Sequence, residues 1–253
     1  MENKRLDYLD NIRWITVVLV IIYHIIYLFN NSGVISNIGV KGIQIMDTFL
    51  IFVYPWFMCL LFIVSGISCN YSLRKRNNKE FIKDRAKRIL LPSVLGIFIY
   101  GWISGFITAQ YTDMFAGNGN NIPGFIKYFI YSLMGIGPLW FCHVLFIGSL
   151  LIVLIRKIDK KEKINNLCKK INLPILFIKV LLVWRSYFIL NTPLITVYRF
   201  GIYLFMMLLG YYVFSNQELI KKLEKISIQL SLISVVTGIC YVYTYYGQNY
   251  TDN

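Results

Sequence analysis

Two ionisable side chains stand in the first long apolar stretch of the chain, Arg13 at its beginning and His24 inside it. In a helix, positions 13 and 24 are separated by about 20° beyond three full turns and by a rise of roughly 16 Å, so both side chains fall on one face. If the stretch crosses a bilayer, Arg13 lies at its edge and His24 near its middle. An imidazole near the middle of a bilayer is costly unless it faces a protein interior or water, which makes a functional site the default hypothesis. The alternative is a histidine that hydrogen-bonds a neighbouring helix as part of the packing.

Other polar or aromatic side chains are weaker candidates. His143, the second of the two histidines, and Trp140 are candidates for binding the substrate. Packing explains His143 equally well, and Trp140 is also typical of an interfacial aromatic belt. Ser65 precedes a glycine but lacks a surrounding G-x-S-x-G motif, which favours close helix packing over nucleophilic catalysis. Asp10 lies three residues before Arg13, on the same helix face, where it would orient the arginine.

These residues must be positioned by membrane helices. The chain has 253 residues, of which 57% are hydrophobic and 15% charged, whereas soluble proteins have about 25% charged residues. Apolar windows of spanning length cover residues 14–30, 47–69, 89–109, 138–155, 173–191, 198–215 and 227–246. Lys179, Trp184 and Arg185 interrupt the fifth window, and the apolar residues 125–136 are too short to span. The sequence predicts an all-α, polytopic integral membrane protein, a bundle of about seven transmembrane helices.

The positive charge of the chain is distributed by loop. Residues 1–13, 70–88, 156–170 and 216–226 hold three, eight, seven and three of the 26 Lys and Arg residues. These stretches alternate with the predicted spans, as the positive-inside rule requires. The rule predicts a cytoplasmic N-terminus and, after seven crossings, a C-terminus outside. The net charge of +14 therefore reflects membrane topology and does not indicate nucleic-acid binding.

The five cysteines show no metal-binding spacing, and four lie in the apolar spans or at their ends. A cysteine in such a place behaves as a small hydrophobic residue. We therefore expect neither a disulfide framework nor a metal site. The first window lacks a small-residue cleavage site and is longer than the apolar part of a secretory signal, so we interpret it as a retained helix.

Four motifs occur in order along the chain. They are Leu9-Asp10-x-x-Arg13 followed by His24, then "FIVSGIS" at 62–68, "FIKDRAKRILLP" at 81–92 with Arg85 and Arg88 in R-x-x-R spacing, and "GPLWFCHVLF" at 137–146. The set resembles the membrane acyltransferase family 3, the integral-membrane O-acyltransferases that modify surface polysaccharides and related acceptors. In the last motif proline replaces the usual histidine. The resemblance is good over the first 155 residues, and beyond them only the topology agrees.

The resemblance implies O-acyl transfer, with acyl-CoA, expected to be acetyl-CoA, as the donor and a hydroxyl of a surface carbohydrate or related molecule as the acceptor. It implies that His24 is the catalytic base, since histidine exchanges protons readily near neutral pH. Arg13 would act with it, and Arg13, Arg85 and Arg88 would bind the donor phosphates as bidentate partners. For the basic loop as a whole, a topological signal that also contacts anionic lipid is the alternative.

Proteins of this family have about ten membrane helices of bilayer-spanning length. We therefore expect residues 1–253 to form a single acyltransferase-3-like domain in the cytoplasmic membrane that lacks the C-terminal helices. Two alternatives stay open at this point. One is an inactive truncated acyltransferase, and the other is a non-enzymatic polytopic protein such as a small transporter or a flippase-like exporter. Transporters typically have internal repeats with broken helices, and the sequence contains no such repeat.

Overall fold

The fold is described here by a computed structural model, which covers residues 7–31, 41–111, 115, 121–169, 172, 174–178, 185, 190 and 198–248. All regular elements in this part of the chain are helices. Five helical spans are long and apolar enough to cross a membrane: Tyr8–Tyr27, Gln44–Leu73, Asn78–Tyr111, Gly137–Ile158 and Ser227–Tyr245. The predicted all-α, polytopic membrane architecture is therefore confirmed.

These five spans coincide with five of the seven predicted windows. The sixth window, 198–215, contains the helix α11 (Phe200–Tyr212), which has 13 residues and is shorter than the roughly 20 residues that cross a bilayer. The fifth window, 173–191, lies largely outside the described residues. The total of seven crossings therefore stays a prediction. Residues 125–136 form the short helix α7 (Gly124–Met134), in agreement with their predicted failure to span.

The chain divides into two compact units. The first comprises Met1–Tyr71, Asp159–Thr192 and Gly201–Asn253, and the second comprises Ser72–Ile158 and Pro193–Phe200. The helices that belong mainly to the first unit are α1 (Asp7–Tyr27), α2 (Gln44–Val53), α3 (Phe57–Leu73), α9 (Lys163–Lys169), α11, α12 (Gln217–Lys225) and α13 (Ser227–Tyr245). Those of the second are α4 (Asn78–Arg85), η1 (Ala86–Leu90), α5 (Leu91–Gly96), η2 (Ile97–Gly101), α6 (Trp102–Tyr111), α7, η4 (Gly137–Leu139) and α8 (Trp140–Ile158).

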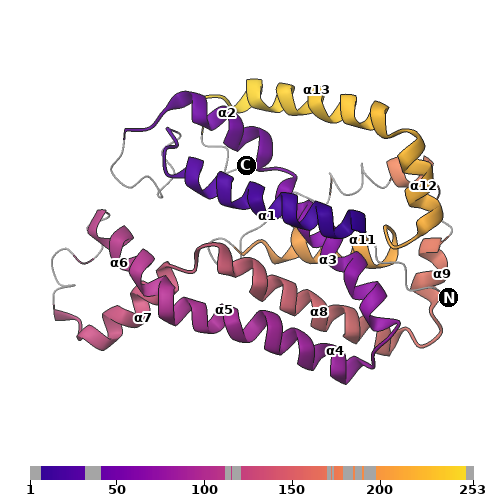
Figure 1. The fold of residues 1–253 in the computed structure, drawn as a ribbon, viewed down its shortest axis with the longest axis horizontal. Helices are drawn as coiled ribbons and strands as arrows, with labels where there is room; N and C mark the ends of the chain where they lie inside the picture. Colours follow the sequence, from indigo (N-terminus) through magenta and orange to yellow (C-terminus); the bar gives the residue numbers. More distant parts are fainter. Residues whose placement is uncertain are drawn as a thin grey trace. The chain divides into compact units, whose positions relative to one another are not determined.

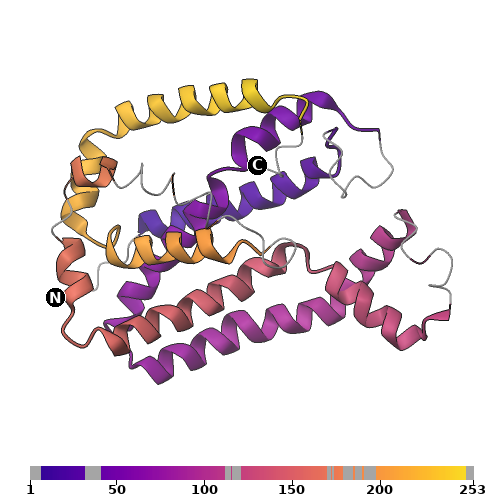
Figure 2. The same ribbon diagram turned by 180° about the vertical axis from the view of Figure 1, so that it is seen from behind.

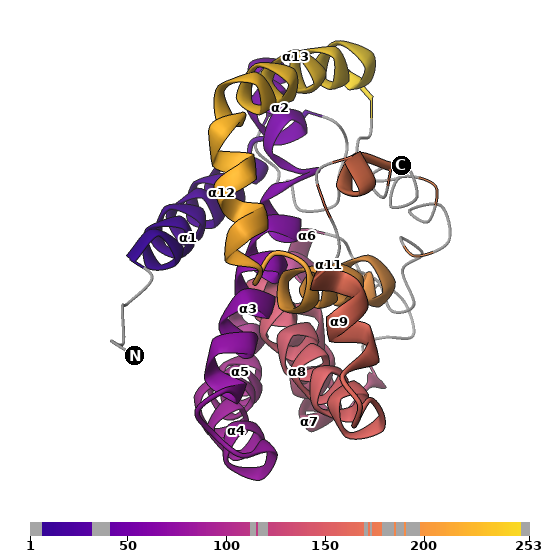
Figure 3. The same cartoon turned by 90° about the vertical axis from the view of Figure 1, so that its right-hand side faces the viewer.

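In the first unit, helix α3 packs against α1 and against α11. It is separated from α2 by a turn that contains Pro55, whose missing N–H cannot continue the helical hydrogen bonds. Glycines let α3 and α11 approach closely, because a Cβ on Gly66 would meet the carbonyl oxygen of Met207. Helix α13 lies beside α2 (Figure 1), and Figure 3 shows α12 leading directly into α13.

Helix α1 is attached to this unit at both ends. Near its beginning, Leu9 packs in a buried cluster with Val64 and Ile67 of α3. Beyond its end, the backbone N–H of Asn31 donates to Oδ1 of Asp47 on α2 at 3.1 Å. These contacts fix α1, which carries Arg13 and His24, within the first unit.

In the second unit, α4, η1 and α5 run alongside α8, as Figures 1 and 2 show. Helix α4 begins with a capping box, in which Asn77 and Glu80 satisfy each other's backbone N–H groups. The wide π-helical turn η1 follows, directly before Pro92 in α5. Proline removes a helical hydrogen bond, and π turns commonly accommodate such breaks and often lie at functional sites. Arg88 belongs to this turn.

Candidate active site

Arg13 is held from two sides in the first unit. Its Nη1 donates to Oδ1 of Asp10 at 3.0 Å, one turn earlier on α1. Its Nη2 donates to Oγ of Ser68 on α3. The Arg13 side chain is 39% exposed, so it lies in the protein surface with part of the guanidinium accessible. The predicted orienting contact of Asp10 is confirmed, whereas the contact with Ser68 was not predicted.

His24 is held by its own helix. Its Nδ1 lies 2.7 Å from the carbonyl oxygen of Val20, one turn earlier. A carbonyl oxygen can only accept a hydrogen bond, so Nδ1 carries the proton and donates it. In the neutral ring this leaves the lone pair on Nε2, for which no partner exists among the described residues. The ring therefore presents Nε2 as a proton acceptor.

The neighbouring Tyr23 anchors this part of α1. Its side chain is buried, and its ring stacks on that of Phe57 at the start of α3, with centroids 4.8 Å apart. The edge of the His24 ring faces Tyr23 at a centroid distance of 5.6 Å. The imidazole thus stands beside a fixed aromatic contact between α1 and α3, which limits its movement.

The other two predicted donor-binding arginines lie in the second unit, where Arg88 is exposed and Arg85 is half-buried. Nε of Arg88 pairs with Oδ1 of Asp84 at 2.8 Å, and 75% of the Arg88 side chain is exposed. The guanidinium of Arg85 lies over the ring of Phe81, 5.2 Å from its centroid. Oδ2 of Asp84 also accepts a hydrogen bond from Arg76 at 3.0 Å, so one carboxylate bridges two arginines.

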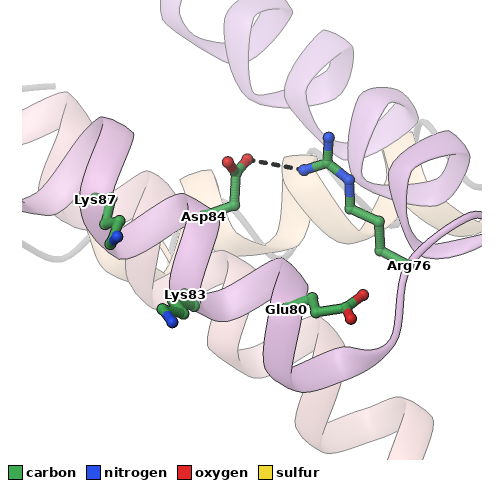
Figure 4. A pocket seen from close by; sticks show the side chains of 5 residues that line it. All are labelled: Arg76, Glu80, Lys83, Asp84 and Lys87. Atoms are coloured by element: carbon green, nitrogen blue, oxygen red, sulfur yellow. Dashed lines mark hydrogen bonds and ion pairs between the residues drawn. The ribbon is translucent and has the colours of Figure 1, made fainter.

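A surface pocket of about 340 Å³ opens beside this carboxylate. Figure 4 shows its lining and the ion pair between Arg76 and Asp84. The lining residues are Arg76, Glu80, Lys83, Asp84 and Lys87. The pocket is therefore lined by basic neighbours of Arg85 and Arg88 and by two carboxylates, not by the predicted pair itself.

A second group of side chains in this unit surrounds His143 on α8. Its Nδ1 is hydrogen-bonded to the Tyr198 hydroxyl at 2.9 Å, and the two rings are nearly parallel, with 17° between their planes. Trp140 meets the same tyrosine edge-on. Nε2 of His143 is buried without a hydrogen-bond partner among the described residues. Tyr198 was missed in the sequence because it stands at the start of an apolar window with no motif around it.

The predicted site residues thus fall into two sets. Arg13 and His24 share α1 in the first unit, while Arg85, Arg88, Trp140 and His143 belong to the second. Within each unit the residues carry different chemistry. The first holds an arginine bonded to two side chains and an imidazole whose Nε2 has no partner among the described residues, and the second holds two further arginines and an aromatic group around a histidine.

Together, the fold and these residues define a multi-pass helical membrane protein with an arginine and a histidine on its first membrane helix. A model of the family 3 acyltransferase domain matches residues 6–253. The chain therefore belongs to this family and is a membrane acyltransferase. The match extends the resemblance, which in the sequence was good only over the first 155 residues, to the C-terminal part. Neither the curated proteins nor the solved structures gave a match.

Proposed function

We propose that this membrane acyltransferase transfers a short acyl group, acetyl in the simplest case, from acyl-CoA to a hydroxyl of a surface carbohydrate or related acceptor, and that it works in the cytoplasmic membrane. The observation that carries the proposal is the free Nε2 of His24, on a helix that also holds Arg13. A transfer to a hydroxyl needs a proton acceptor next to the attacking oxygen. His24 supplies one inside the first membrane helix.

The reaction would proceed by attack of the acceptor oxygen on the thioester carbonyl. Nε2 of His24 takes the hydroxyl proton while the new C–O bond forms and the C–S bond of the donor breaks. The CoA thiolate leaves and receives the proton back from the imidazolium. Nδ1 keeps its proton throughout, because it remains bonded to the carbonyl of Val20. The hydrogen bond to Val20 therefore selects the tautomer that the chemistry requires.

The phosphates of CoA require cations, and the chain offers them in two places. The Arg13 guanidinium is planar and presents five N–H donors, a geometry suited to phosphate. Arg85 and Arg88, with the basic lining of the pocket beside Asp84, supply further positive charge. By the positive-inside rule, α4 and its basic surroundings face the cytoplasm, where acyl-CoA is made.

The acceptor would be bound by His143 and its neighbours. Flat aromatic rings suit the apolar faces of sugars, and a polar tip can meet their hydroxyls. Trp140 supplies a ring, and the His143–Tyr198 pair supplies both a ring surface and a buried nitrogen that lacks a partner. These features support a carbohydrate acceptor over a purely apolar one.

Labelled acetyl-CoA tests the proposal. Membranes that contain the protein should transfer radiolabel from acetyl-CoA to an alkali-labile ester, while membranes with His24→Gln at the same protein level should not. If the parent transfers no label to any membrane component, the donor or the whole assignment is wrong. Reporter fusions after residues 75, 115, 160, 195 and 222 test the orientation. They should read in, out, in, out, in, and two adjacent fusions on one side would contradict the topology.

A further inference from the structure

Ser68, the last residue of the motif at 62–68, makes a contact that the motif did not predict. Its Oγ accepts a hydrogen bond from Nη2 of Arg13, a residue 55 positions earlier in the chain. Both residues lie in the first unit, Arg13 on α1 and Ser68 on α3. The contact therefore connects the arginine of the R-x10-H motif to a second membrane helix.

The direction of this hydrogen bond is fixed by a second one. The hydroxyl of Ser68 donates its only proton to the carbonyl oxygen of Val64 at 2.8 Å, one turn earlier on α3. The lone pairs of Oγ are then the part of the hydroxyl left for other partners, and a guanidinium can only donate. Ser68 is thus set up as an acceptor for Arg13.

The packing between α1 and α3 fixes the distance across which the contact forms. Leu9 of α1 is buried against Val64 and Ile67 of α3, with Ile12 and Ile63 packed around them. The carbonyl oxygen of Val64 accepts the hydrogen bond of the Ser68 hydroxyl, and Ile67 directly precedes Ser68. The two polar contacts of Arg13 therefore rest on a buried apolar cluster that holds both helices.

The hydrogen bonds of Arg13 to Asp10 and Ser68 leave most of its N–H donors for a ligand. Asp10 takes one N–H of Nη1 and Ser68 takes one N–H of Nη2. Of the five N–H donors of an arginine, this leaves the Nε donor and one on each Nη without a partner among the described residues. Asp10 alone would hold the side chain at one point of its own helix. Ser68 adds a second point and so restricts rotation of the plane.

We propose that Ser68 is a positioning residue, which holds the Arg13 guanidinium in the orientation in which its remaining N–H groups bind a phosphate of the acyl donor. This inference rests on the proposed function, in which Arg13 contacts acyl-CoA. Ser68 itself touches no substrate. It acts only through Arg13, and this dependence makes the inference testable.

The first test is Ser68→Ala. We expect the KM for acetyl-CoA to rise by about 10-fold, near the lower end for one lost hydrogen bond to a charged group, with little change in kcat because donor binding is uniform. Ser68→Thr keeps the hydroxyl and should stay within about two-fold of the parent. Ser215→Ala is the matched control, since Ser215 is a buried serine of the same unit whose Oγ donates to the carbonyl of Tyr211 at 2.6 Å. It removes a hydroxyl-to-carbonyl hydrogen bond with the same four-residue spacing, in the turn after α11, and its KM should equal that of the parent.

The second test asks whether Ser68 acts through Arg13. Equilibrium binding of radiolabelled acetyl-CoA to the purified protein is measured for the parent, Ser68→Ala, Arg13→Ala and the double variant. In the Arg13→Ala background, the serine substitution should change Kd by less than about two-fold, because coupled residues are not additive. Fully additive effects would overturn the positioning role, as would an unchanged KM in Ser68→Ala or an equal loss in Ser215→Ala.

The two levels of failure are distinguishable. If the parent neither binds nor uses acetyl-CoA, the proposed function is wrong and the role of Ser68 falls with it. If the parent binds acetyl-CoA and Ser68→Ala binds it equally well, only the role of Ser68 is wrong.

Discussion

Arg13 and Arg88 are predicted to bind the same donor, yet the protein holds them in different ways. Each pairs with an aspartate on its own helical segment, Asp10 for Arg13 and Asp84 for Arg88. Arg13 has a further contact with Ser68 on a second helix and is 39% exposed, whereas the Arg88 side chain is 75% exposed. The difference is that tertiary packing fixes Arg13, whereas the partner of Arg88 among the described residues is a neighbour in sequence.

This contrast has energetic consequences. An exposed ion pair contributes about 0–1 kcal/mol and is screened by salt, so Arg88 can exchange Asp84 for a phosphate at little cost. Asp84 would still keep its contact with Arg76. A guanidinium fixed between two helices loses less conformational freedom when it binds. We infer that the first unit supplies fixed groups for chemistry and the second supplies adaptable charge for capture.

His24 is where the comparison predicts the largest effect. A general base typically contributes about 10²–10⁴-fold to the rate, so His24→Ala should lower kcat by roughly this factor while acetyl-CoA binding persists. His24→Gln keeps hydrogen-bonding capacity but cannot take up a proton at neutral pH, and it should be about as inactive as His24→Ala. The measurement is turnover of radiolabelled acetyl-CoA at matched protein levels in the membrane.

The glutamine variant separates the two interpretations of this histidine. If His24 served only packing, glutamine would restore most of the activity. Thr16→Val is a suitable control, because Thr16 is buried on the same helix and donates only to the carbonyl of Ile12. An active His24→Gln enzyme would show that His24 is not the base. The proposed difference between a first unit with catalytic groups and a second unit with binding charge would then be wrong.

For Arg85 and Arg88 the comparison predicts an effect on binding. Arg85→Ala and Arg88→Ala should each raise the KM for acetyl-CoA by about 3- to 10-fold and leave kcat nearly unchanged, since phosphate contacts stabilise ground and transition states alike. Lysine should restore only part of the affinity, because the planar fork is lost. The effect should also shrink as salt is raised, since exposed charges are screened.

Kinetics at low and high salt test this second prediction. Lys79→Ala serves as the control, because Lys79 is another cation of α4 that belongs neither to the R-x-x-R pair nor to the lining of the pocket. Equal changes for Lys79 and for the two arginines would indicate that the segment acts only through its total charge. A fall in kcat with an unchanged KM would place Arg85 or Arg88 among the fixed groups and break the comparison.

Contacts between residues that are close in the sequence could be predicted from it, and contacts between distant residues could not. The contact of Asp10 with Arg13 is predictable, because residues three apart on a helix are neighbours. The five long spans are predictable, because a bilayer demands long apolar segments. The hypothesis that His24 acts as a base follows in part from its position inside a membrane helix, but the choice of Nε2 depends on the hydrogen bond to Val20 and needs coordinates.

The contacts between residues far apart in the sequence could not be predicted from it. Ser68 reaches Arg13 only because Leu9 packs against α3, and no local pattern encodes that pairing. Tyr198 meets His143 across 55 positions and is unremarkable in its own segment. Arg88 is recognisable in the sequence by its R-x-x-R spacing, yet its exposure depends on how η1 packs in the second unit. Local periodicity therefore predicts which side chains share a helix face, and packing decides which of them are held by a second helix.

The smallest expected effect concerns the two aspartates, and its sign differs between the units. Asp10 supports an arginine that is fixed for the donor, so Asp10→Ala should raise the KM for acetyl-CoA by about 3-fold, because Arg13 then turns toward water at the membrane surface. Asp84 competes with the donor for Arg88 and also occupies Arg76. Asp84→Asn should therefore lower KM by about two-fold at low salt, a change within the range of exposed ion pairs.

Parallel KM measurements on Asp10→Ala and Asp84→Asn test whether the two aspartates have opposite effects on donor binding. If both substitutions weaken binding, Asp84 supports its arginine as Asp10 does, and the exposed segment is more ordered than its partners suggest. If both strengthen it, the aspartates act only through their charge, and the orientation of Arg13 contributes nothing to donor binding.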